Sequence, residues 1–222
     1  MRKEVGILLA VAVVVVVAGV VGASYYRGSV QKAPVAADTS QNLVRPDSAT
    51  IGPAGAKVTV VEFLDPECES CAAFAPQVKG LLKEFEGRVR FVVRYMPLHK
   101  NAKLAAQYTE AAGEQGKYWE FQEKLFAEQD EWGEKHGAGH DHQPTAPVST
   151  LFEKYGKEIG LNPEQLNAAA GNKKYADKAD RDLADGRALG VRQTPTFFVN
   201  GRKLARLSIQ DLRSLINEEL NK

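Results

Sequence analysis

The strongest constraint on the fold is a pair of cysteines placed between an expected strand and an expected helix. Both cysteines of the 222-residue chain, Cys68 and Cys71, lie in the segment DPECESCAAF. The run before them, Val58–Leu64, is short and β-branched, which is typical of a strand buried on both faces. From residue 68 to 86, apolar side chains recur at helical spacing. Both thiols are therefore expected on the first turn of a helix that directly follows a strand.

The remaining apolar pattern predicts an α/β domain interrupted by helices. A second short strand, Val89–Tyr95, completes a βαβ unit, whose crossover is expected to be right-handed. Near the other end, Asn200-Gly201 separates two strand-like pieces and predicts a tight hairpin, after which Ser208 begins a helix. Helical periodicity covers the stretch from about 100 to 189. The predicted domain thus spans 57–222 and carries a helical insert.

The N-terminal residues form a separate segment. Val5–Ala23 is a run of 19 uncharged residues, and a helix of that length nearly spans the roughly 30 Å hydrocarbon core of a bilayer. The run exceeds the roughly 7 to 15 residues of a signal-peptide core. Residues 1–26 are therefore predicted to be an uncleaved membrane anchor, with a cleaved signal as the alternative. Residues 27–56, rich in Ala, Pro, Ser and Gly, are predicted to be a flexible linker.

Both interpretations of this segment place the folded domain outside the cytoplasm. The prediction is a single-pass protein of the cell membrane, with its domain on the extracytoplasmic, periplasmic side. The formal net charge is only +1, and no run of basic residues suggests nucleic acid as a partner. No cofactor and no metal are predicted.

The spacing of the cysteines predicts redox chemistry. Residues at i and i+3 are neighbours on a helix, so the two sulfurs can close a short disulfide with little backbone movement. Cys68 would lie at the helix N-terminus, where unpaired N–H groups and the helix dipole favour a thiolate. Cys68 is therefore predicted to be the nucleophile, and Cys71, one turn inside, the resolving thiol.

Two other uses of the cysteines are weaker. A structural disulfide would close a loop so small that it would restrain little chain entropy. A structural zinc site normally needs four ligands, and only His99, His136, His140 and His142 could complete one. Three of these histidines lie in HGAGHDH, which is more simply interpreted as a solvated loop.

Glu62 interrupts the first apolar strand six residues before Cys68. A carboxylate buried in a strand is costly unless it is protonated or paired, so its pKa is expected to be raised. Such a carboxyl group beneath the thiols could carry the proton of the resolving cysteine. The alternative is a solvated strand end, in which Glu62 would be an ordinary surface carboxylate.

With EFLDPECESC before the helix and TPTFFVNG late in the chain, residues 44 to 220 resemble the DsbA-like branch of the thioredoxin superfamily. The resemblance implies a thioredoxin-like fold, βαβ plus ββα around a central sheet, with a helical insertion. It implies that Cys68 is the exposed nucleophile, Cys71 the resolving thiol and Glu62 the buried acid. It also implies that Thr194-Pro195 is a cis-proline loop facing the disulfide, where the Thr194 backbone would pair with an extended substrate.

The sequence departs from the strongly oxidising relatives, which the resemblance associates with a histidine between the cysteines. Here the dipeptide is Glu69-Ser70, preceded by Asp65 and Glu67. Negative charges oppose a thiolate, so the Cys68 pKa is expected to be raised and the dithiol to be active but less oxidising than those relatives.

The predicted function is a membrane-anchored thiol-disulfide oxidoreductase that exchanges disulfides with exported proteins. Its redox partner would be a quinone-linked membrane oxidase or a membrane reductant, and the sequence leaves the direction of electron flow open. The alternatives are a non-catalytic client-binding module and a metal carrier that uses the same two cysteines, together with His99.

Overall fold

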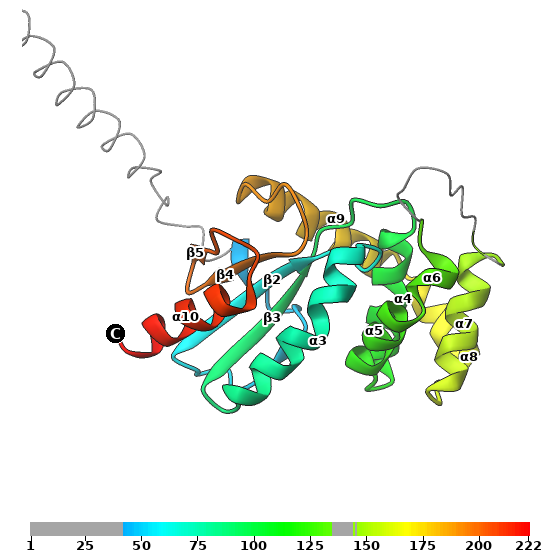
Figure 1. Cartoon of the computed structure of the whole chain (residues 1–222). Coiled ribbons are helices and arrows are strands. Elements are labelled where there is room, and N and C mark those ends of the chain that lie inside the picture. The colour runs from blue at the N-terminus through cyan, green and yellow to red at the C-terminus, as the bar shows by residue number, and fades with distance from the viewer. Residues whose placement is uncertain (1–41, 135–143, 145) are drawn as a thin grey trace, which may run out of the picture. The chain divides into compact units, whose positions relative to one another are not determined.

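A mixed five-stranded sheet in the order β1-β3-β2-β4-β5 organises the domain (Figure 1). The structure is a computed structural model that describes residues 42–134, 144 and 146–222. The central strand β2 (Val58–Leu64) pairs parallel with β3 (Val89–Tyr95) and antiparallel with β4 (Thr196–Val199). Two-residue strands, β1 (Thr50–Ile51) and β5 (Arg202–Lys203), form the edges, both antiparallel. The predicted α/β architecture is confirmed.

Helices α3 (Glu69–Glu84) and α10 (Ile209–Leu220) lie on one side of the sheet (Figure 1). The apolar faces of both helices share one core with alternate side chains of the strands, because successive strand residues point to opposite faces. Ser208 caps α10 by accepting a hydrogen bond from the Asp211 N–H. The predicted hairpin is also present: Asn200 and Gly201 both have positive φ, at 45° and 82°, as a tight two-residue turn requires.

Helix α9 (Lys173–Ala188) packs on the opposite face of the sheet. There Phe63 and its neighbours on β2, β3 and β4 form a second core with the partly buried Leu183. Helix and sheet approach closely at Gly186, where a Cβ would lie 2.8 Å from Met96 Sδ and 3.0 Å from the Phe63 ring. The sheet is therefore covered on both faces, as its continuous apolar strands require.

The helical insert has a core of its own. It comprises α4 (Ala102–Glu114), α5 (Tyr118–Ala127), α6 (Gln129–Trp132), α7 (Val148–Glu158) and α8 (Pro163–Ala170) and leads into α9. Phe152 lies at its centre, with ring centroids of four aromatic residues within 6.4 Å: Tyr108, Phe121, Trp132 and Tyr155. The predicted helical insert at about 100–189 is thus present as a packed subdomain.

The segment 42–51 belongs to the fold, so the predicted linker 27–56 extends too far. Leu43 is 5% exposed and packs in the core beneath α9, and β1 pairs with β3. Arg45 donates two hydrogen bonds of 2.9 Å to Asp185 of α9. The sequence of residues 42–51 shows no periodic pattern, because only single side chains and a two-residue strand hold this segment to the domain.

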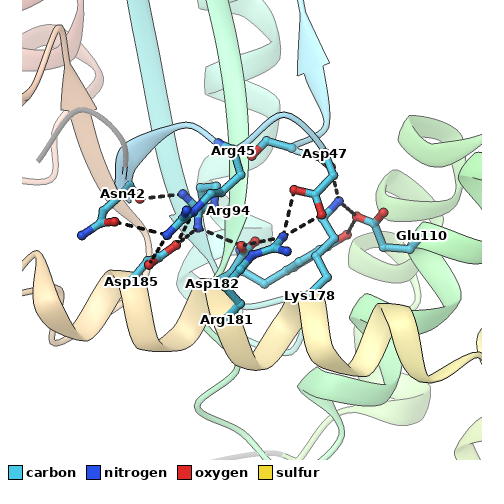
Figure 2. Close-up of polar contacts among 11 residues, drawn as sticks. Asn42, Arg45, Asp47, Arg94, Glu110, Lys178, Arg181, Asp182 and Asp185 are labelled. Carbon is cyan, nitrogen blue, oxygen red and sulfur yellow. Dashed lines mark hydrogen bonds and ion pairs between the residues drawn. The ribbon is translucent and has the colours of Figure 1, made fainter.

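A buried arginine fastens this segment to the domain (Figure 2). Arg94 of β3 is fully buried and donates to the Asn42 carbonyl oxygen at 2.6 Å, to Asp182 at 2.8 Å and to Asp185 at 2.6 Å. Nearer the N-terminus of α9, Arg181 forms an ion pair with Asp47. We call residues 42–51 the N-terminal strap.

The predicted membrane anchor, residues 1–26, lies outside the described residues. In the part of the chain that the structure describes, none of the helices combines the length and the apolar character needed to cross a bilayer.

Candidate active site

Both cysteines lie at the start of α3, as the sequence predicts. Cys68 is the N-cap residue, and its side chain makes no capping hydrogen bond. Cys71 lies on the first turn, at 1% exposure against 8% for Cys68. Both are free thiols. The more accessible sulfur therefore lies at the positive end of the helix, and the less accessible one lies beneath it.

The loop before β4 lies directly beside the first thiol. The Thr194–Pro195 peptide bond is cis, and Cys68 Sγ lies 3.5 Å from the Thr194 carbonyl oxygen. Thr194 is half-buried and Pro195 is buried. Residues 126 positions apart are thus brought together, and the Thr194 backbone lies where an incoming chain would meet Cys68.

The local hydrogen bonds lower the pKa of Cys68 to about 5. The Cys71 side chain contributes most, burial opposes the shift, and the Thr194 side chain and the N–H groups of Cys71 and Ser70 add to it. The prediction that neighbouring carboxylates raise the Cys68 pKa is wrong. A stabilised thiolate favours the reduced form, so the argument from these charges for a less oxidising dithiol fails with it.

The carboxylates fail to oppose the thiolate because backbone N–H groups surround them. Asp65 accepts hydrogen bonds from the N–H groups of Glu67, Leu98 and His99 at 2.8, 2.6 and 3.1 Å. Glu67 accepts from Asn101 N at 2.6 Å and from Glu134 N at 3.0 Å. Donors of this kind compensate a carboxylate charge, which limits its effect on a neighbouring sulfur.

Glu62 is a buried acid. It is 5% exposed on β2, and its register partners are Val93 and Phe197, so the alternative of a solvated strand end is wrong. Burial, aided by the charge of Cys68, raises the pKa of Glu62 to about 8. Burial, the Cys68 hydrogen bond and the charge of Glu62 raise the pKa of Cys71 well above its usual value. One thiol with a lowered pKa, Cys68, and one with a raised pKa, Cys71, therefore lie near the carboxyl group of Glu62, which is neutral below pH 8.

Comparisons with known proteins show the family and the fold. A sequence model described as thioredoxin matches residues 45–218. The chain belongs to the thioredoxin family. Among solved structures, BdbD from Bacillus subtilis is 25% identical to this thioredoxin, with a TM-score of 0.66 over 79% of this chain and 94% of that one. Wolbachia pipientis α-DsbA1, at 19% identity and a TM-score of 0.69, covers 82% and 96% and shares the fold. The protein thus belongs to the thioredoxin superfamily and has a DsbA-like fold.

Part of the sequence of several longer curated proteins also matches this chain. The Na(+)/H(+) antiporter NhaA of Herminiimonas arsenicoxydans is 34% identical over 153 residues, which is 69% of this chain and 22% of that protein. The antiporter NhaA 3 of Salinispora tropica is 36% identical over 155 residues, which is 68% and 21%. The chain spans about a fifth of the length of these relatives.

The structure describes one of the four histidines, His99. His99 Nδ1 lies 2.8 Å from Asp65 Oδ2. Within the described ranges, no group of three or more His, Cys, Asp or Glu side chains is arranged to hold a metal ion. His136, His140 and His142 lie outside the described residues.

The sequence alone did not identify Asp65, His99 and Asn101 as one cluster. A signal was present, since Leu64 and Tyr95 are register partners that end neighbouring parallel strands. The residues that follow them meet at the same edge of the sheet, which is where α/β proteins place their sites.

Replacing Glu62 by glutamine is expected to stabilise the reduced thioredoxin at pH 7 by about 3 kcal/mol. The folded-state pKa of about 8 lies above the unfolded value of 4.5, so the folded state binds more protons between these limits. Wild-type stability should therefore fall as pH rises from 4.5 to 8, and Glu62→Gln should remove that loss. Urea unfolding at pH 5 and pH 8 measures it; equal pH dependence in both proteins would contradict the buried acid.

Proposed function

We propose that the protein is a membrane-anchored, extracytoplasmic thiol-disulfide oxidoreductase that passes its disulfide to exported proteins. The observation that carries this proposal is the placement of Cys68 at the N-terminus of α3, above Cys71 and 3.5 Å from the Thr194 carbonyl oxygen. The membrane location depends on the apolar run Val5–Ala23.

The first step uses the Cys68–Cys71 disulfide. A client thiolate attacks Cys68 Sγ, a mixed disulfide forms, and Cys71 leaves with the electron pair of the broken bond. Glu62, which is protonated below pH 8, can supply a proton to Cys71. Because the pKa of Cys71 lies well above its usual value, Cys71 then remains a thiol.

The second step releases the client. A second client thiolate attacks the client sulfur of the mixed disulfide, and Cys68 leaves as a thiolate. The client has lost two electrons and the protein has gained them. A leaving thiol of low pKa departs faster, so the Cys68 pKa of about 5 favours the oxidising direction. A quinone-linked membrane oxidase would restore the disulfide; an electron flow in the reverse direction would need a membrane reductant.

Cys71→Ala tests this function. When the variant is mixed with a client that carries a disulfide, the Cys68 thiolate attacks that disulfide and one client sulfur leaves as a thiolate. Because the resolving thiol is missing, the mixed disulfide between Cys68 and the client is expected to accumulate, visible as thiol-sensitive adducts on non-reducing gels. The matched control, Cys68→Ala with Cys71→Ala, should show none. If Cys71→Ala binds clients as the wild type does, without covalent adducts, the protein is a non-catalytic binding module.

A further inference from the structure

His99 lies beside the thiol pair, although it is 34 positions from Asp65 in the sequence. One carboxylate oxygen, Asp65 Oδ2, accepts from Leu98 N at 2.6 Å, His99 N at 3.1 Å and His99 Nδ1 at 2.8 Å. The Asp65 carbonyl oxygen in turn accepts from Cys68 N at 3.1 Å. A single residue therefore fixes both the imidazole ring and the nucleophilic cysteine.

We propose that His99 is a positioning residue for disulfide exchange: an imidazolium held by Asp65 that compensates the Asp65 carboxylate and stabilises the Cys68 thiolate. This inference deepens the proposed function and rests on it. It assigns to the loop after β3 an electrostatic role in the reaction of a cysteine on α3.

The ring geometry supports this role. The Asp65 carboxylate can only accept, so Nδ1 carries a proton towards it. The His99 side chain is 23% exposed, which keeps it open to protons from solvent while its Asp65 partner is fully buried. An ion pair with one buried partner is screened less by water than a surface pair.

The charges around the ring are mostly negative. Asp65, Glu67 and Cys68 face it from the loop before α3, and next to it Lys100 pairs with Glu134 at 3.7 Å. Burial lowers the pKa of His99, but the Asp65 hydrogen bond and the charges of Asp65, Cys68 and Glu67 outweigh it, and the pKa is raised. The coupling is reciprocal, so a thiolate that favours imidazolium is itself favoured by imidazolium.

In the exchange reaction His99 acts when Cys68 leaves the mixed disulfide. The electron pair of the broken S–S bond stays on Cys68 Sγ, and no proton transfer from His99 is needed. The imidazolium keeps the Asp65 carboxylate from repelling the new thiolate. Without a cation at His99, only the backbone N–H donors would compensate the Asp65 carboxylate, and the thiolate would form beside a carboxylate of more negative effective charge.

His99→Asn tests the proposal in the full chain, because the shorter amide keeps a donor near Asp65 and removes the cation. The Cys68 pKa, followed by thiolate absorbance of the reduced protein, is expected to rise by about one unit. That tenfold change corresponds to a redox potential about 30 mV lower against glutathione. His99→Lys should restore most of the shift, and Leu98→Ala, which changes no charge, should leave the Cys68 pKa unchanged.

A second measurement needs no substitution. The His99 pKa, followed by ring-proton NMR, should be higher in the reduced protein than in the oxidised one, because only the reduced protein carries the thiolate. Equal His99 pKa values in both states, or an unshifted Cys68 pKa in folded His99→Asn, would overturn the proposal. Neither readout involves a client, so failure here is distinguishable from failure of the Cys71→Ala trap.

Discussion

At pH 7, brief iodoacetamide treatment of the reduced protein is expected to alkylate Cys68 at least about a hundredfold faster than Cys71. The thiolate is the reacting species, and with a pKa of about 5 Cys68 is almost entirely ionised at this pH. Cys71 is 1% exposed, and burial raises its pKa, so it remains a thiol that is shielded from the reagent. Mass spectrometry of the two peptides, separated after cleavage, gives the ratio.

The pH dependence gives the sign of the Cys68 shift. The alkylation rate should be flat above about pH 6 and fall by half near pH 5, because protonation of the thiolate removes the nucleophile. Its plateau need not be high, since intrinsic nucleophilicity falls as the pKa falls. Cys68→Ser should be nearly unreactive at pH 7. A midpoint near that of free cysteine, about 8.5, would contradict the stabilised thiolate.

Replacing Arg94 by methionine is expected to destabilise the protein by about 3 to 5 kcal/mol. The substitution leaves Asp182, whose side chain is 1% exposed, without its close cation, and releases the Asn42 carbonyl oxygen of the N-terminal strap. Removing one partner of a buried ion pair costs the desolvation of the other. Urea unfolding of the full chain measures the loss.

Two controls separate this effect from a general loss of charge. Arg94→Met combined with Asp182→Asn removes the charges of Arg94 and Asp182, leaves Asp185 paired with Arg45, keeps an acceptor for Tyr95 N, and should recover part of the stability. Lys79→Met breaks an ion pair with Glu123 in which both side chains are more than half exposed, and should cost less than about 1 kcal/mol. Equal losses in Arg94→Met and Lys79→Met would contradict the importance of burial.

The sequence predicted the elements that are defined by their own local pattern. Strands β2 and β3 have the predicted bounds. Each is a short, mostly apolar run, and the structure buries six of the seven residues in each, as expected for strands covered on both faces. The helix N-terminus at Cys68 and the turn at Asn200 follow from local chemistry in the same way.

Features held together by distant single contacts were not predicted. The N-terminal strap is held by hydrogen bonds from Arg94 to Asn42 and Asp185. No local pattern in the sequence indicates that these three residues meet. Likewise, counting charges near Cys68 gave the wrong sign for its pKa. The count treated Asp65 as a solvated anion, whereas the fold surrounds this carboxylate with N–H donors from the loop after β3.

Both margins of the sheet end in strands of two residues, and this length has a consequence for the proposed exchange with exported proteins. After Ile51 the backbone turns away at Gly52, where a Cβ would come within 2.2 Å of the Val89 carbonyl oxygen. Long open margins template the addition of extended polypeptides. Under the proposed function, extended clients would therefore pair beside Thr194 and have little opportunity to aggregate along the borders of the sheet.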